Sequence, residues 1–358
     1  MVNFAAKTSM YKHLIRPLLF LINPEKVHKL VVITIKALFF LPGISLLFDK
    51  LFNISNPKLK RTLFGLDFAN PVGLAAGFDK NASFYNEFSH MGFAFIEIGT
   101  VTPKGQMGNA KPRLFRLKSD KALINRMGFN NLGAEAAVKQ LKKRKTKIII
   151  GGNLGKNTCT PNEEAVGDYV YTFNTLYDYV DYFVVNVSCP NISDLHKLQD
   201  KDSLMDILGS LLNARSAKQQ SKPILLKISP DLNFAQLDEV IEIVTTLKID
   251  GIVATNTTTG RYHLSINDGA IAQIGNGGMS GMPLRDRSTE VIRYIAQKTN
   301  GSVPIIGVGG ILSPADAIEK LEAGASLIQL YTGFIYEGPM LAKLINKAIL
   351  KQIQTLQK

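Results

Sequence analysis

The feature that most constrains the fold is a series of eight short apolar runs, rich in β-branched residues, that follows Pro57. Helix-length amphipathic segments separate several of them, at 133–143, 202–216, 234–247 and 289–299. Strands of a parallel sheet that are covered on both faces read as continuous apolar runs, so this pattern predicts an α/β fold closed as a (β/α)₈ barrel. An open doubly wound sheet is the alternative. The eight runs are NPVGLAAG (from Asn70), FAFIEIGT (Phe93), KIIIGGNL (Lys147), YFVVNVS (Tyr182), PILLKIS (Pro223), GIVATNT (Gly251), PIIGVGG (Pro304) and LIQLYTG (Leu327).

Most of these runs end in polar residues or glycine. A barrel carries its active site at the C-terminal ends of its strands, so we expect these residues to converge on one mouth. They are 77–80, 99–100, Asn153, 186–191, Lys227, 255–257, 309–310 and 331–333.

Three groups at the predicted mouth indicate a ligand. Glycines end the seventh and eighth runs, where barrels commonly bind phosphate through backbone N–H groups, although glycine also simply closes turns. Lys80 and Lys227 can balance a carboxylate or an electron-rich ring; a structural ion pair is the alternative. Five asparagines suit a planar ligand with alternating N–H and C=O edges, such as a pyrimidine, although a single Asn is more often a turn or cap residue. They are Asn125, Asn153, Asn186, Asn191 and Asn256.

The first fifty residues have a different character. Apolar runs at 18–22, 30–35 and 37–48 are interrupted by Lys26, His28, Lys29 and Lys36, and none approaches the roughly 20 residues that span a bilayer. The pattern predicts a pair of short helices, broken near 23–24 and 41–43, that lies in a membrane interface. A helical hairpin packed on the main domain is the alternative.

Composition limits the classes of ligand and cofactor that the protein can bind. The formal charge of +13 suits anionic small molecules or an anionic membrane surface, and the sequence shows no nucleic-acid-binding motif. Two cysteines cannot form a disulfide framework. Cys189, directly after an apolar run, is therefore either a small buried hydrophobe or a thiol in the mouth. No ligand-spaced histidine or acidic cluster is present, so we predict no catalytic metal.

Ten motifs, in order, resemble the dihydroorotate dehydrogenases, and specifically their membrane-associated, quinone-linked class. The similarity runs from about Pro24 to Ile349. The motifs are NPVGLAAGFDKN, FIEIGTVTPKGQMGNAKPRLFRL, INRMGFNN, NLGKN, VVNVSCPN, LLKISPDL, GIVATNTT, GGMSGMPLRD, VPIIGVGGI and ASLIQLYT.

The resemblance implies a flavoenzyme that oxidises dihydroorotate to orotate in pyrimidine biosynthesis, with FMN as hydride acceptor and a membrane quinone as final acceptor. It implies Cys189 as the catalytic base. FMN would be held by Ala76, Gly77, Lys80, Thr100, Asn153, Asn186, Lys227, Thr255, Gly281, Gly310, Tyr331 and Thr332. Dihydroorotate would be held by Lys80, Asn125, Arg126, Met127, Gly128, Phe129, Asn186, Asn191, Asn256 and Thr257. The quinone passage would be lined by His28, Arg116 and Tyr331.

The resemblance also implies an organisation. Residues 1–53 form an N-terminal helical extension for membrane association and quinone access, and residues 54–358 form the catalytic barrel. We expect a monomer bound peripherally to the cytoplasmic face of the cell membrane, with no nucleic-acid partner.

One motif departs from the quinone-linked class. Its members usually carry Ser as the base, in an SSPNT-type motif, whereas this chain reads SCPNI with Cys189 and Ile192. Cysteine is typical of the soluble class, which uses fumarate or a nicotinamide-linked partner and lacks such an extension. The extension, His28, Arg116 and the INRMGFN loop favour the quinone class. Outside this family, the same residues would also allow a Schiff-base lyase built on Lys80 or Lys227, or a non-enzymatic membrane scaffold.

Overall fold

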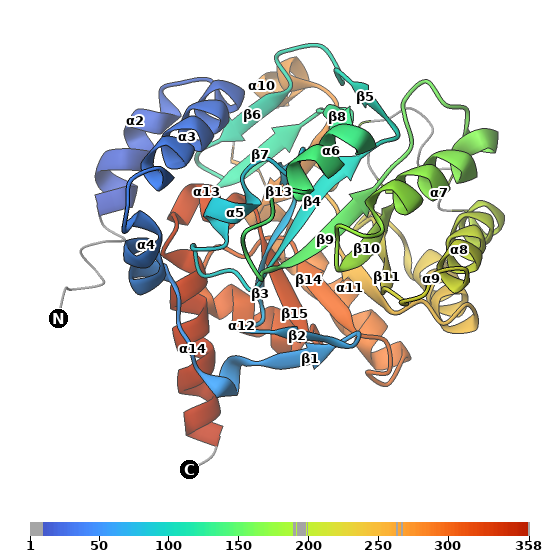
Figure 1. Ribbon diagram of the computed structural model, residues 1–358. Coiled ribbons are helices and arrows are strands. Elements are labelled where there is room, and N and C mark those ends of the chain that lie inside the picture. The colour runs from blue at the N-terminus through green and yellow to red at the C-terminus, as the bar shows by residue number, and fades with distance from the viewer. Residues whose placement is uncertain are drawn as a thin grey trace.

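The computed structural model describes residues 10–188, 191, 198, 200–262, 264–265 and 268–356. Eight parallel strands close into a barrel in which neighbours in the chain are neighbours in space, and helices surround it (Figure 1). The predicted barrel is confirmed and the open sheet is excluded, because β15 pairs with β3 and closes the ring. The strands are β3 (Val72–Asp79), β4 (Phe95–Val101), β9 (Ile149–Leu154), β10 (Tyr182–Asn186), β11 (Ile224–Ile228), β12 (Gly251–Ala254), β14 (Ile305–Val308) and β15 (Leu327–Leu330).

Helices cover the outer face of the barrel, and their apolar residues meet the outward-facing residues of the strands in one large buried cluster. Each of the four segments predicted as amphipathic is helical, although α11 begins four residues before the predicted start. The helices are α5 (Tyr85–Phe88), α6 (Ala134–Leu141), α7 (Ala165–Leu176), α8 (Lys201–Ser216), α9 (Phe234–Thr246), α10 (Asp268–Ile274), α11 (Arg285–Lys298), α12 (Pro314–Glu322), α13 (Thr332–Glu337) and α14 (Leu341–Leu356).

Aromatic rings fill the barrel interior at the end opposite the mouth. Phe95 and Tyr182 are fully buried there, and a hairpin of β1 (Arg61–Leu63) and β2 (Leu66–Phe68) places Phe68 edge-on against Phe95. Glycines face both rings: a Cβ on Gly73 would lie 2.4 Å from the Phe95 ring, and one on Gly151 would lie 2.2 Å from the Tyr182 ring. The closed bottom leaves the other end of the barrel for a ligand.

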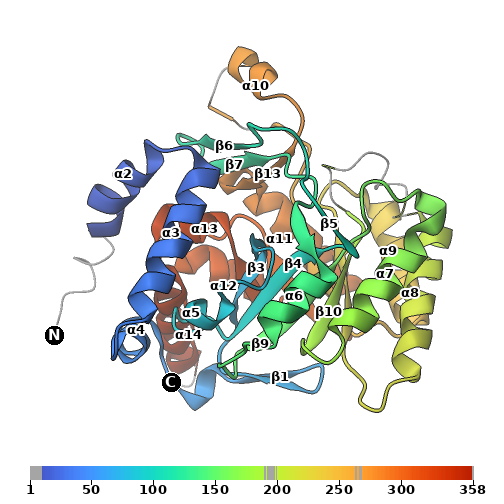
Figure 2. The same cartoon turned by 45° about the horizontal axis from the view of Figure 1, so that its top comes forward.

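Short antiparallel strands at the other end of the barrel build up its mouth, and the sequence did not predict them. One sheet has the order β13 (Gly278–Gly281), β7 (Ala122–Asn125), β6 (Leu114–Leu117), and β5 (Lys104–Gln106) pairs with β8 (Asn131–Gly133). In Figure 2 the sheet β6–β7–β13 lies at the same end of the molecule as α10 and the start of α3. These strands carry the predicted substrate residues of 125–129 to the mouth.

The N-terminal segment forms a π-helical turn η1 (Tyr11–Ile15) that runs into α2 (Arg16–Phe20), followed by α3 (Pro24–Phe39) and α4 (Ile44–Phe52). The two predicted breaks are confirmed. Asn23 accepts hydrogen bonds from the backbone N–H groups of Glu25 and Lys26 and so caps α3. A further helical stretch, η1 with α2, precedes the predicted pair.

The extension both packs on the barrel and exposes apolar side chains. Tyr11 donates a hydrogen bond to the Ile335 carbonyl, and Arg16 donates one to the Tyr336 carbonyl. Within the described part of the chain, no helix is by itself long and apolar enough to cross a membrane; α3 and α4 meet that test only as a pair, bent by 117° at their break.

Candidate active site

A cleft of about 1050 Å³, open space at its rim included, occupies the mouth of the barrel. Eighteen of the residues that the sequence assigned to the cofactor or the substrate border it, from segments spread over more than 250 positions of the chain. They are Ala76, Gly77, Lys80, Thr100, Asn125, Met127, Gly128, Phe129, Asn186, Asn191, Lys227, Thr255, Asn256, Thr257, Gly281, Gly310, Tyr331 and Thr332.

Among the described residues that were assigned to the cofactor or the substrate, two do not border the cleft. Arg126 donates hydrogen bonds to the Pro112 and Ile274 carbonyls, so it ties its loop to α10. Asn153 is fully buried behind the cleft wall. The predicted base Cys189, and Ile192, lie outside the described residues.

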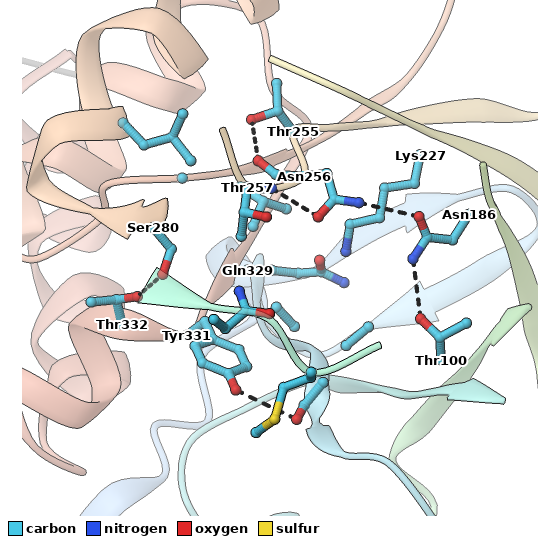
Figure 3. A pocket seen from close by; sticks show the side chains of 18 of the residues that line it. Thr100, Asn186, Lys227, Thr255, Asn256, Thr257, Ser280, Gln329, Tyr331 and Thr332 are labelled. Atoms are coloured by element: carbon cyan, nitrogen blue, oxygen red, sulfur yellow. Dashed lines mark hydrogen bonds between the residues drawn. The ribbon is translucent and has the colours of Figure 1, made fainter. Parts of the chain in front are cut away.

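A network of amides and hydroxyls forms one wall of the cleft (Figure 3). The Asn186 amide donates to the Thr100 hydroxyl at 3.1 Å, and its oxygen accepts from the Asn256 amide at 3.2 Å. Asn153 accepts from the Thr100 hydroxyl at 2.5 Å and so braces this wall from behind. Since each amide has a fixed partner, its donor and acceptor atoms point in defined directions.

A buried carboxylate beneath the cleft is the main feature that sequence reasoning missed. Glu97 is fully buried and accepts hydrogen bonds from the amides of Asn153 (2.7 Å) and Gln329 (2.6 Å), and its Oε1 lies 3.5 Å from the Lys227 ammonium. The Lys227 side chain is only 7% exposed, so its charge is held inside the barrel mouth. The signal in the sequence was an acidic residue inside an otherwise apolar strand, FIEIG.

The opposite wall carries Lys80 and the loop of residues 125–129. The Lys80 ammonium donates to the Asn130 amide oxygen at 2.5 Å, and the Asn191 amide donates to Asn125 at 2.9 Å. Among the described residues, the buried amide oxygens of Asn191 and Gln329 have no hydrogen-bond partner. The Asn191 oxygen, a buried acceptor without a partner on a side chain that borders the cleft, fits a ligand with an N–H group.

The turn at Gly310 and the first turn of α13, at Gly333, close the cleft on its third side. Gly310 has φ +69°, and a Cβ there would lie 2.3 Å from the Arg285 Cα; at Gly333 a Cβ would lie 1.9 Å from the Ile311 carbonyl oxygen. Because there is no room for a Cβ at these positions, the backbone itself borders the cleft. Backbone N–H groups are the donors that commonly bind a phosphate. The hydroxyls of Ser280 and Thr332, 2.8 Å apart, lie beside these turns (Figure 3).

A second, mainly apolar cavity of about 2000 Å³, open space included, lies between the N-terminal helices and the barrel. The predicted passage residues His28, Arg116 and Tyr331 all line it. It meets the first cleft at Gly77, Lys80, Met127 and Tyr331, which border both.

Burial shifts the pKa values of two side chains that line the second cavity, His28 and Tyr331. Burial, and to a smaller extent the nearby Lys80 charge, lowers the pKa of His28 to about 4. Burial also raises the pKa of Tyr331 to about 12. Arg116 stacks over the Phe20 ring at 4.4 Å and donates to the Ile22 carbonyl at 2.7 Å. At neutral pH, His28 in the second cavity and Tyr331 at the junction of the two cavities are therefore uncharged.

Within the residues that the structure describes, no group of three or more His, Cys, Asp or Glu side chains could hold a metal ion. Amide edges, a buried Lys227 and glycine turns instead fit a planar, phosphate-bearing organic cofactor with a small polar substrate beside it. Fold and site together define a barrel enzyme of this class.

Comparisons with known proteins agree. The family model of dihydroorotate dehydrogenase matches residues 58–353. A Christiangramia forsetii protein named dihydroorotate dehydrogenase (quinone) is 57% identical over 344 residues, covering 96% of this chain and 99% of that protein. A protein of the same name from Gloeobacter violaceus is 48% identical over 346 residues, with 95% and 94% covered. The crystal structure of Eimeria tenella DHODH in complex with ferulenol superposes with a TM-score of 0.84 at 33% identity, with 93% and 92% covered. The chain belongs to the dihydroorotate dehydrogenase family.

Proposed function

We propose that this protein oxidises dihydroorotate to orotate in pyrimidine biosynthesis, with FMN as the bound cofactor and a membrane quinone as the final electron acceptor. The observation that carries the proposal is the junction of two unlike cavities, one polar and one apolar, at Gly77, Lys80, Met127 and Tyr331. A polar cleft alone would suit many barrel enzymes. An apolar cavity that reaches it from the N-terminal helices suits a lipid-soluble oxidant.

FMN is supported by the fit of its parts to three walls of the cleft. The glycine turn at Gly310 and the start of α13 at Gly333, with the Thr332 hydroxyl, would take the phosphate. Thr100, Asn186 and Lys227 would meet the polar edge of the ring system. When bound, FMN supplies the hydride acceptor for the C6 hydrogen of the substrate. The other predicted cofactor residues are Ala76, Gly77, Lys80, Thr255, Gly281 and Tyr331, with Asn153 acting from behind the wall.

The same cleft supplies the groups that dihydroorotate needs. Lys80 would pair with the substrate carboxylate, and the amides of Asn125, Asn191 and Asn256 would bind the edges of its ring. Cys189 follows Ser188, whose hydroxyl accepts from the Asn256 amide at 3.0 Å. We assign Cys189 as the base that takes the C5 proton, because a thiolate is a stronger base at neutral pH than a serine hydroxyl.

The N-terminal helices would place the apolar cavity against a lipid surface. Leu21, Phe40 and Leu46 are 80%, 88% and 73% exposed, and Lys26 and Lys29 lie exposed in the first turns of α3, close in sequence to Leu21. Exposed apolar residues flanked by lysines are typical of helices that lie in a membrane interface. The proposal therefore includes peripheral association of a monomer with the cytoplasmic face of the cell membrane.

The decisive experiment is anaerobic. Purified protein should be yellow, its flavin absorbance should bleach on addition of dihydroorotate, and a long-chain quinone should restore it. Protein that carries flavin but is not bleached by dihydroorotate would refute the proposed substrate. Bleached protein that fumarate or NAD⁺ reoxidises, and quinone does not, would refute the proposed acceptor.

A further inference from the structure

An ion pair joins the N-terminal extension to the barrel. Glu25, in the first turn of α3, accepts two hydrogen bonds from the Arg113 guanidinium, at 3.1 Å from Nε and 3.0 Å from Nη2. The two side chains are 15% and 7% exposed, so solvent screens the pair little. Neither residue was singled out from the sequence.

The remaining nitrogen of Arg113 holds a short segment of the mouth. Its Nη1 donates to the carbonyls of Met107 (2.6 Å) and Asn109 (2.9 Å). We call residues 107–109 the brace. One guanidinium therefore binds Glu25 with one edge and the brace with the other, which a lysine cannot do because it lacks the planar fork.

The brace in turn contacts the substrate loop 125–129. The Asn109 backbone N–H donates to the Met127 carbonyl at 3.1 Å. Gly108 lies so close that a Cβ there would be 2.2 Å from the same carbonyl, and a Cβ on Gly128 would be 2.7 Å from the Asn109 amide oxygen. Packing this close transmits a displacement of the brace to the loop.

The brace also reaches the segment that carries the proposed base. The Asn109 amide donates to the Asn191 carbonyl at 3.1 Å, and the Asn191 amide donates to Asn125. Asn191 stands two positions after Cys189 in the sequence. The brace thus touches both chain segments that would surround the substrate.

We infer that Arg113, anchored by Glu25, is a positioning residue for the substrate: the N-terminal extension orders the dihydroorotate side of the cleft as well as the quinone side. The inference rests on the proposed function. An extension that served only membrane association and quinone access would have no need of a buried charge pair leading to the substrate loop. Arg113 acts through the brace, since it does not itself border the cleft.

The test compares Glu25→Gln with a matched variant in the full-length holoprotein, with no quinone present. Orotate affinity is measured by calorimetry. Glu25→Gln keeps the side-chain size but removes the charge that anchors Arg113. We expect the dissociation constant of orotate to rise on the order of 10-fold, since small displacements of positioning groups cost this much or more. The dihydroorotate concentration that half-saturates single-turnover flavin reduction should rise similarly, with the rate of that reduction at saturating substrate retained within a few-fold.

The control is Asp181→Asn. Asp181 also pairs with a partly buried arginine, Arg144 at 2.8 Å, but it stands just before β10 at the closed end of the barrel. Both variants should lower the thermal midpoint, and only Glu25→Gln should weaken orotate binding. Equal orotate affinity in the parent and a folded Glu25→Gln variant would overturn the inference.

A double variant separates action through Arg113 from a direct effect of Glu25. In an Arg113→Met background, Glu25→Gln should weaken orotate binding no further. Should Arg113→Met not fold, Arg113→Lys serves as the background. Additive losses would refute the relay. A parent protein that fails to bind orotate at all would instead refute the proposed function.

Discussion

At the scale of single residues, the neighbours of a buried polar group in this barrel determine its orientation and its charge. Glu97 is satisfied by two amides and lies near one ammonium, and it thereby orients Asn153, Gln329 and Lys227 beneath the cleft. His28 is half-buried, with its ring centroid 5.1 and 5.7 Å from those of Phe78 and Phe84. The ion pair of Glu97 and Lys227 places charged groups beneath the cleft. The apolar surroundings of His28 instead favour its uncharged form.

The lowered pKa of His28 predicts a pH dependence of stability. The unfolded chain binds a proton at His28 near pH 6.5, whereas the folded protein binds it only near pH 4. Between these values the unfolded state holds more protons, so the free energy of unfolding falls as pH falls, by up to about 3 kcal/mol over the window. His28→Phe should therefore lose less thermal stability than the parent between pH 7 and pH 5. Equal losses in the two proteins would contradict this assignment.

The proposed base Cys189 has an internal control in the other cysteine, Cys159, which is exposed. Cys189→Ala should bind FMN normally, yet its flavin reduction by dihydroorotate should slow by roughly 10²–10⁴-fold, the usual contribution of a positioned base. Cys189→Ser should keep partial activity with a higher pH optimum. Cys159→Ala should match the parent. Rapid mixing measures all four proteins, and an alanine variant at position 189 within a few-fold of the parent would exclude the thiol as base.

At the scale of elements, the turn after β14 meets the start of α11 with almost no space between them. Gly309 and Gly310 both have positive φ, +126° and +69°, and both abut residues 284–288. Lys320 of α12, fully buried, donates to the Arg285 carbonyl and the Thr289 hydroxyl and so holds α11 in place. The turn therefore has a rigid support on the side away from the cleft.

This support makes Gly310→Ala a test of the phosphate site. A Cβ at 310 would force Arg285 away, so we expect the protein to lose bound FMN, measured as the flavin-to-protein absorbance ratio. Gly301→Ala is the matched control, because Gly301 has nearly the same φ, +70°, with no atom within 4 Å of the added Cβ. Both substitutions cost about 1 kcal/mol in backbone strain. Equal flavin content in the two variants would show that the turn does not hold the phosphate.

At the scale of the whole molecule, the N-terminal helices lie along one side of the barrel, next to α13 and α14 (Figure 1). They contribute 14 of the 31 residues that line the apolar cavity and most of the large exposed apolar side chains of the described residues. Under the proposed function, the apolar cavity and the exposed apolar side chains would thus share one surface that meets the lipid and admits the quinone.

Membrane association follows as a prediction about that surface. Phe40→Asp with Leu46→Asp should reduce binding to vesicles of anionic phospholipid by on the order of 10²-fold or more, since each charged residue at the interface opposes burial. Tyr262→Asp, at a side chain 75% exposed in the loop that leads to α10, is the control and should bind as the parent does. Sedimentation with vesicles measures the bound fraction. Undiminished binding of the double variant would assign the exposed residues another role.

The local pattern of the sequence was enough to predict the barrel, since eight apolar runs at crossover spacing allow few other folds, and the polar ends of parallel strands must share one edge. The breaks of the N-terminal helices followed from Asn23, Pro24 and Gly43 in the same way. The residues at the cleft were largely foreseen, because strand ends and motifs mark them.

Only the tertiary structure decided which side chains stand behind that cleft. Asn153 and Arg126 occur in the motifs that predicted them, yet neither borders the cleft. In the sequence, Glu97 is only an acidic residue inside an otherwise apolar strand. The Glu25–Arg113 pair joins residues 88 positions apart, and no periodicity or local propensity encodes such a contact. Sequence periodicity determines which elements form and which face they bury; pairing between distant elements depends on how the closed barrel and its extension pack, and that is known only once the chain has folded.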